Sequence, residues 1–125
     1  MPKTSLKTAP TVAEFDAAVD TSDRLADVTV DFVSIRQSHS LAGVLVGLPG
    51  DSCQCPHWGY MFAGEMTVSY PDHQEVYRAG DAFYMTPGHV PAALAGSEFV
   101  QFSPTAELNV TLAHMQAVAM ATQSS

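Results

Sequence analysis

Two cysteines and two histidines between positions 53 and 89 have types and spacing that could do chemistry. Cys53, Cys55 and His57 alternate along the chain, so an extended backbone would direct all three side chains to one face. His89 follows a turn later in the chain. Thiolates and imidazoles together suit Zn²⁺ or another borderline-to-soft metal, and imidazoles beside an open position suit copper or iron. These residues predict a site for one divalent transition metal, either Zn, Cu or Fe.

Each of these residues also has a structural interpretation. A free cysteine often behaves as a small buried hydrophobic side chain. His57 could be a buried imidazole bonded to a backbone carbonyl, and His89 could be exposed beside its turn. Pro56 interrupts regular strand pairing and weakens the argument from alternation. Cys53 and Cys55 are at the far limit of disulfide geometry if extended, so we expect two free thiols.

The elements that must position these residues are short strands. Apolar and polar residues alternate from Val28, with a change of phase at Val33 that predicts a bulge. Several further strands are separated by turn residues, and this spacing is typical of an all-β sandwich or barrel. They are predicted at 66–70, at 75–78 as its hairpin partner, at 82–85, at 90–94 and at 98–102.

Other segments predict helices, a turn and a buried strand. Thr11 with Glu14 three places on predicts a short N-terminal helix opened by a capping box. Residues 20–27 are polar and turn-like, and the apolar run 41–48 predicts a strand that is buried or lies at a dimer contact. A C-terminal helix is predicted over about 105–120, with one apolar stripe formed by Leu108, Leu112, Met115 and Val118.

Two blocks in this chain resemble the cupin superfamily. The first runs from Pro49 to Glu65 and the second, Ala-Gly-Asp-Ala-Phe-Tyr-Met-Thr-Pro-Gly-His, ends at His89. The resemblance covers about residues 41–104 and implies an all-β fold, a cupin jelly-roll β-barrel, here with the short N-terminal helix and the C-terminal helix. Residues 1–10 are rich in Lys, Thr, Ser and Pro and predict a flexible arm. The rest of the chain is expected to form a single domain (11–125) with a barrel core at about 28–104.

The resemblance also implies a metal, but with a modified ligand set. Cupins typically use two histidines and a glutamate from the first block and a histidine from the second. Here His57 stands at the glutamate position, while Asp51 and Cys53 stand where histidines are usual. Pro91 occupies the last histidine position, and His89 lies two residues earlier, where a continuing strand would keep its inward direction. The metal ligands predicted are therefore His57, His89, Cys53 and Cys55.

The expected function is that of a small cupin that uses this metal on a small organic molecule, as an oxygenase, isomerase or lyase. Tyr60, Phe62 and Met85 are predicted to contact the substrate, and no residue is assigned a catalytic role. One alternative is a metal-free cupin that binds a small molecule in its barrel. The other is a dimeric interaction protein that pairs through residues 41–48 and the C-terminal helix. We expect the chain to form a homodimer whichever of these functions it has.

Composition limits the partners. The chain has 125 residues, 46% of them hydrophobic, which is enough for one domain with a core. Thirteen acidic against five basic residues give a net charge of −8, which repels phosphate backbones and anionic membrane surfaces. We therefore expect no nucleic acid and no membrane partner. With no apolar run behind the first lysines and no run of about 20 apolar residues, a cytoplasmic location is expected.

Overall fold

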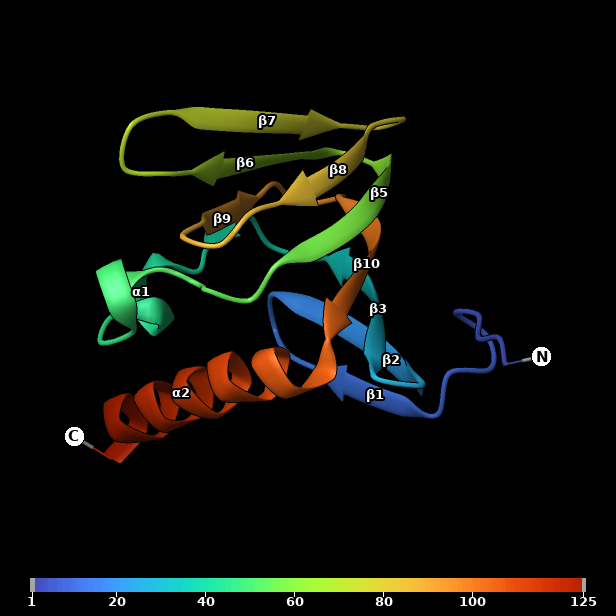
Figure 1. Cartoon of the computed structure of the whole chain (residues 1–125), viewed down its shortest axis with the longest axis horizontal. Helices are drawn as coiled ribbons and strands as arrows, with labels where there is room; N and C mark the ends of the chain where they lie inside the picture. The colour runs from blue at the N-terminus through green and yellow to red at the C-terminus, as the bar shows by residue number, and fades with distance from the viewer. Residues whose placement is uncertain (1, 125) are drawn as a thin grey trace.

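The computed structural model describes residues 2–124, and the side chains of residues 2–121. Ten strands form two antiparallel sheets, which face one another in Figure 1. The six-stranded sheet has the order β1 (Thr11–Glu14), β2 (Ala18–Leu25), β3 (Val28–Ile35), β10 (Glu98–Pro104), β5 (His57–Ala63), β8 (Ala82–Met85). The four-stranded sheet has the order β4 (His39–Ser40), β9 (Val90–Ala93), β6 (Glu65–Ser69), β7 (Gln74–Arg78).

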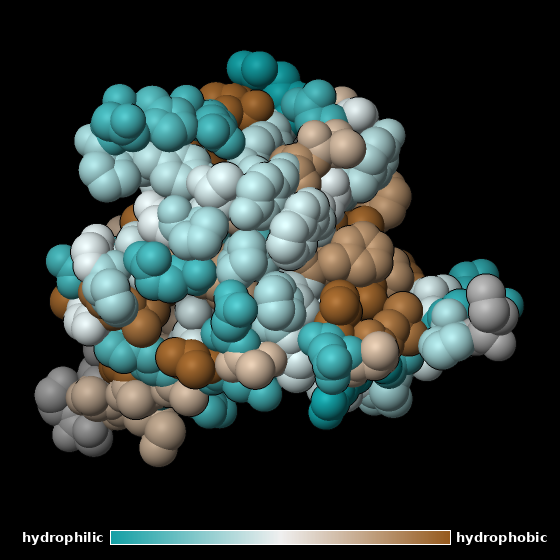
Figure 2. Space-filling view, viewed as in Figure 1, coloured by the Kyte–Doolittle hydropathy of each residue, from teal (hydrophilic) through white to brown (hydrophobic). Residues whose placement is uncertain are grey.

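The core lies between the two sheets because side chains alternate along each strand. On β5, His57 and Met61 are buried, whereas Trp58, Tyr60 and Phe62 are exposed on the outer face. The main buried cluster is formed by residues from strands of both sheets. Its members are Ile35, Met61, Met66, Val68, Tyr77, Phe83, Met85, Ala93 and Phe99. Figure 2 shows hydrophilic side chains gathered over β7 and hydrophobic ones over β10 and β3.

Several predicted strands are confirmed. The hairpin of β6 and β7, the strand β8 and the strands β9 and β10 lie within one or two residues of the predicted limits. The strand from Val28 is also present, but the predicted bulge is not, since β3 pairs with β2 and β10 in unbroken register. The change of phase at Val33 arises because Val30 and Val33 point to opposite faces of the strand. Val33 packs against the main core cluster, and Val30 is 1% exposed but does not belong to that cluster.

Three predictions for the N-terminal half are wrong. Residues 11–14 form strand β1 rather than a helix, because each of them pairs with a residue of β2. Residues 20–25, predicted as a turn, belong to β2, which pairs with β3 over its whole length. The apolar run 41–48 contains a helix, α1 (Ala42–Leu45), followed by a 3₁₀ turn at Pro49–Asp51, so it forms no continuous strand.

The C-terminal helix is confirmed as α2 (Thr105–Ser124) and lies beside one end of the barrel in Figure 1. Its buried face includes Leu108 and Thr111, and Met115 packs beside them. Leu112, predicted to share this face, is 47% exposed, because the buried face of α2 passes through Thr111 instead. Within residues 2–124, no helix has both the length and the apolar character needed to cross a membrane.

Candidate metal centre

Three of the four predicted ligands meet inside the barrel. One ligand atom each from Cys53, His57 and His89 can be chosen so that all lie within 4.8 Å of one another. The three residues are 4%, 6% and 1% exposed, respectively. The group lies near the end of the barrel that α2 covers, because Cys53 packs in one cluster with Leu108.

Two loops bring these residues together. Cys53 precedes β5 in a loop, and its backbone N–H donates to the carbonyl of His89 over 2.9 Å. The N–H of Gly88 in turn donates to the carbonyl of Cys53 over 2.8 Å. Gly88 has φ of +94°, a backbone conformation that glycine adopts without strain and that lets the second loop close on the first. The backbone pairing of 53 with 89 therefore fixes two ligands relative to each other.

His57, the first residue of β5, is held by β10. Its Nδ1 lies 2.6 Å from the Oγ of Ser103, and its Nε2 lies 3.8 Å from the Sγ of Cys53. A tautomer with hydrogen on Nδ1 donates to Ser103 and presents the Nε2 lone pair to the thiol. The rings of His57 and His89 meet edge to face, with centroids 5.0 Å apart.

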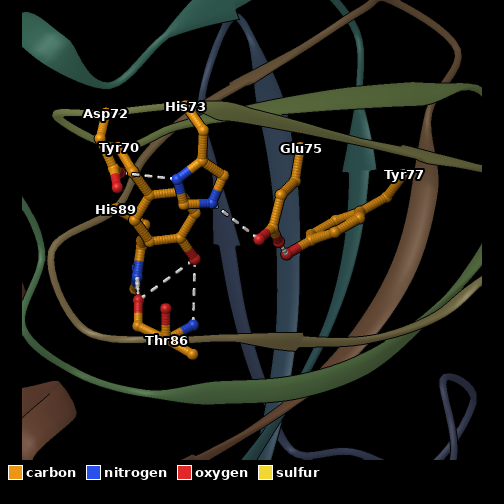
Figure 3. A network of polar contacts seen from close by, with 7 residues as sticks. All are labelled: Tyr70, Asp72, His73, Glu75, Tyr77, Thr86 and His89. Atoms are coloured by element: carbon orange, nitrogen blue, oxygen red, sulfur yellow. Dashed lines mark hydrogen bonds and ion pairs between the residues drawn. The ribbon is translucent and has the colours of Figure 1, made fainter.

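His89 is oriented by the backbone of Thr86. Its Nδ1–H donates to the carbonyl of Thr86 over 2.7 Å, which leaves the Nε2 lone pair free of this contact. The hydroxyl of Tyr70 contacts the same residue, accepting from the Thr86 N–H over 3.1 Å and donating to its carbonyl over 3.4 Å. Figure 3 shows this connection, with Tyr70 between Thr86 and the ring of His73. Tyr70 therefore supports the peptide that sets the tautomer of His89.

The surface side of this network is itself anchored. The rings of Tyr70 and His73 stack with centroids 4.7 Å apart. His73 contacts the carboxylates of Asp72 at 2.7 Å and Glu75 at 3.0 Å (Figure 3). Hydrogen bonds to these two carboxylates raise the pKa of the exposed His73 imidazole. The hairpin of β6 and β7 thus connects by contacts to a buried candidate ligand.

Burial keeps both candidate imidazoles neutral. It lowers the pKa of His57 to about 3, with a smaller contribution from His89 nearby. Burial also lowers the pKa of His89, although the hydrogen bond with Thr86 opposes this shift. The same burial raises the pKa of the Cys53 thiol. At neutral pH the site holds two neutral imidazoles, the form that binds metals, and one thiol that must lose its proton to become a ligand.

Cys55 lies outside the group of three. Its thiol contacts the carbonyl of Pro56 at 3.5 Å rather than either imidazole. Burial raises its pKa to about 12, with further contributions from Cys53, Glu107 and Asp31. The predicted alternation fails here because the loop before β5 is not an extended strand and Cys53 forms only an isolated bridge with His89. Both cysteines are free thiols, as expected.

The three residues predicted to contact substrate do not lie together. Met85 is 1% exposed and belongs to the core. Tyr60 and Phe62 are 41% and 56% exposed and contact each other on the outer face of β5, with ring centroids 5.4 Å apart. Because His57 points inward and side chains alternate, the even-numbered residues of this strand point away from the site. We therefore leave Tyr60 and Phe62 out of the candidate centre.

Sequence reasoning missed several residues around the centre. Ser103 and Thr111 contact His57 and Cys53 directly, the second through a Thr111 Oγ1 to Cys53 Sγ distance of 3.6 Å. Their partners are 46 and 58 residues away in the chain, so no local spacing indicates the contacts. Alternation on β10 with the buried Phe99 is the one signal that could have turned Ser103 inward.

Two interacting carboxyl groups lie on neighbouring strands of the six-stranded sheet. Asp31 on β3 is 6% exposed, and Asp20 on β2 is half-buried beside it. Burial raises the pKa of Asp20 to about 8, and the charge and hydrogen bond of Asp31 contribute further. Burial also raises the pKa of Asp31, while hydrogen bonds from Asp20 and Gln101 lower it. Burial and the proximity of the two carboxyl groups therefore favour a proton shared by the pair at neutral pH.

The donor set fits a transition metal. Across residues 2–121, this is the one group of three or more histidine, cysteine or acidic side chains with metal-site spacing. Each imidazole is oriented by a hydrogen bond at Nδ1, as is common for ligating histidines. Such a set can bind a metal of borderline or soft character.

Solved structures with a fold similar to that of this chain include a cupin. An RmlC-like cupin from Shewanella frigidimarina NCIMB 400 superposes with a TM-score of 0.56 and 14% identity, over 83% of this chain and 92% of that one. The Fe(II) form of HppE gives a TM-score of 0.58 with 8% identity, over 82% and 60% of the two chains.

A third similar structure is oxalate decarboxylase from Lactobacillus farciminis in complex with formate. Its TM-score is 0.59 with 14% identity, over 81% of this chain and 32% of that chain, so this protein spans about a third of the enzyme. Comparison of sequences finds no protein-family model and no curated protein that matches. At these identities the likeness concerns the fold.

Proposed function

From the cupin fold of this chain, we propose that it binds one divalent transition metal through Cys53, His57 and His89 and acts with it on a small organic molecule. The observation that carries the proposal is the convergence of three buried ligand atoms within 4.8 Å. Two neutral imidazoles held by separate hydrogen bonds are already in the form that ligates. HppE with Fe(II) and oxalate decarboxylase with formate are examples of this fold with a metal and with a small ligand.

The residues around the centre have separable tasks in this proposal. A bound metal would act as a Lewis acid that polarises an oxygen of the substrate. Ser103 and the Thr86 carbonyl orient the two imidazoles, and they hold the hydrogen on each Nδ1. Helix α2 covers the centre through Leu108 and Thr111, so it limits the access of water and of large molecules. The proposal therefore favours a small substrate.

Elemental analysis of the untagged protein, with His57→Ala and His89→Ala variants, tests this proposal. We expect about one equivalent of metal in the parent, and its loss in both variants. His39→Ala is the matched control, because His39 bonds to the backbone of Gln37 outside the centre and should leave the metal content unchanged. A parent that contains no metal and takes up no Zn²⁺, Cu²⁺ or Fe²⁺ would overturn the proposal and favour a metal-free binding protein.

A second candidate function, self-association, is favoured by the outer face of the six-stranded sheet. Five aromatic side chains on β5, β8 and β10 are between 41% and 56% exposed there: Trp58, Tyr60, Phe62, Tyr84 and Phe102. Exposed apolar surface of this kind is typical of interaction sites. We propose a second copy of this chain as the partner, in place of pairing through residues 41–48. Light scattering should give the mass of a dimer, and a Tyr84→Lys variant should be a monomer.

A further inference from the structure

Resting on the metal centre proposed above, we infer that its metal is copper, bound by the Cys53 thiolate and the Nε2 atoms of His57 and His89. We further infer that Thr111 on α2 donates a hydrogen bond to the sulfur. The inference concerns the chemical class of the metal and the control of its properties. It depends on the donor atoms, on their spacing and on the contacts of the sulfur.

The donor atoms favour a soft metal. One sulfur and two imidazole nitrogens converge, and among residues 2–121 no carboxylate belongs to the group. Hard cations such as Mg²⁺ and Mn²⁺ prefer carboxylate and carbonyl oxygen, and non-haem iron is usually held by two histidines and a carboxylate. Copper and zinc remain, and copper binds the more tightly of the two at sites of nitrogen and sulfur.

The spacing of the donors lets one ion contact both the sulfur and the first imidazole. The Sγ of Cys53 and the Nε2 of His57 are 3.8 Å apart. Bonds of about 2.3 Å to sulfur and about 2.0 Å to nitrogen span at most about 4.3 Å, so this pair can share one metal. The three ligand atoms lie within 4.8 Å of one another, so the group contracts by less than about 1 Å when it binds.

The sulfur of Cys53 has two polar neighbours besides His57. The carbonyl of Cys55 lies 3.8 Å away and accepts from the thiol S–H in the metal-free protein. The hydroxyl of Thr111 lies 3.6 Å from the same sulfur, in a buried position 5% exposed.

Thr111 would then tune the copper. A hydrogen bond to the thiolate withdraws electron density from the sulfur, so the sulfur donates less to Cu²⁺ and the reduced ion is favoured. Hydrogen bonding around a cysteine ligand is a known means of setting the potential of such sites. On binding, the S–H bond of Cys53 breaks and its proton goes to solvent, with no change in the oxidation state of copper.

Addition of Cu²⁺ without oxygen, followed by absorption spectroscopy, tests the inference. The parent should gain an intense visible band from charge transfer between thiolate and copper at one equivalent. A Cys53→Ser variant should lose the band. Cys55→Ser is the matched control, since this buried cysteine lies outside the group of three, and it should keep the band. Circular dichroism of each variant shows whether it is folded.

Two further measurements remain informative if Cys53→Ser does not fold. X-ray absorption of the copper-loaded parent should show one sulfur neighbour. Thr111→Val should keep the band but lower the reduction potential, while Thr105→Val, whose hydroxyl bonds with Thr29 away from the centre, should leave the potential unchanged.

Two other results would overturn the inference. Copper that binds with no charge-transfer band and no sulfur neighbour would refute the thiolate site. If Zn²⁺ still binds at one equivalent and is lost in His57→Ala, the proposed metal centre stands and only the copper inference fails. A parent that binds neither metal refutes both.

Discussion

The hydrogen bond between Ser103 and His57 gives a sharp test of how the candidate centre is built. In a Ser103→Ala variant, the Nδ1 of His57 loses a partner at 2.6 Å in a place that solvent hardly reaches, since Ser103 is 1% exposed. Leaving a buried polar group without a partner costs about 1–3 kcal/mol of folding free energy. The Ala side chain fits within the space of Ser, so no steric effect adds to this.

The Ser103→Ala variant should also lose metal affinity, and this loss should exceed that of a variant with the same loss of folding stability. Removal of a partner that orients a ligating histidine weakens metal binding by about 10–100-fold, which is about 1.4–2.7 kcal/mol. We expect a fall in Zn²⁺ affinity of this size, measured by competition with a chromophoric chelator at pH 7. Urea unfolding of the metal-free protein measures the stability in parallel.

Ser97→Ala is the matched control. Ser97 is also buried and its hydroxyl has two hydrogen bonds, to the N–H and carbonyl of Glu65, far from the centre. This variant should lose comparable stability and keep its metal affinity. If Ser103→Ala binds Zn²⁺ as tightly as the parent, or loses no more affinity than Ser97→Ala, then the hydrogen bond does not orient His57 for a metal.

Two further perturbations address the network of Figure 3 and the buried carboxyl pair. Tyr70→Phe should weaken Zn²⁺ binding by up to about 10-fold, because the peptide that orients His89 loses its support, whereas Tyr77→Phe should not. Asp20→Asn should remove a pH dependence of stability. The folded state holds a proton on Asp20 up to about pH 8, whereas the unfolded state releases it near 3.8. Stability from this group is therefore present at low pH and is lost as pH rises to about 8.

Each of these two predictions has its own readout. For Tyr70, equal affinity of the two tyrosine variants would show that the Thr86 contact plays no part. For Asp20, thermal unfolding between pH 5 and pH 9 should show the variant gaining on the parent as pH rises. Asp16→Asn makes the same change of charge at an exposed position and serves as the control. A constant difference across this range for Asp20→Asn would contradict the protonated state.

The strands that could be predicted from sequence are those whose pattern agrees with local pairing. Alternation marks the hairpin of β6 and β7, and turn residues bound it on both sides. At Thr11 and Glu14 the local signal for a capping box gave a helix, but pairing with β2 makes the segment a strand. The run 41–48 was equally ambiguous, because a short apolar segment has no period that separates helix from strand.

The candidate centre was predictable in residue type and only partly in geometry. Alternation placed Cys53 near His57, yet the contact comes from a loop paired with the backbone of His89 and not from a strand. The same loop turns Cys55 toward Pro56. Ser103 and Thr111 reach the centre from strands and helices distant in the chain, and such contacts depend on the packing of the whole barrel rather than on any local pattern.

Trp58 has a practical consequence for optical work. It is the single tryptophan of the chain and follows His57 directly, but it lies on the outer face of the sheet, 47% exposed. There it stacks on Tyr84 with ring centroids 4.8 Å apart. Its emission wavelength will therefore report solvent at the outer surface of the sheet, and burial of that surface should shift it to the blue. A bound paramagnetic ion one residue away in sequence should quench the same emission, so one fluorophore can monitor both faces of β5.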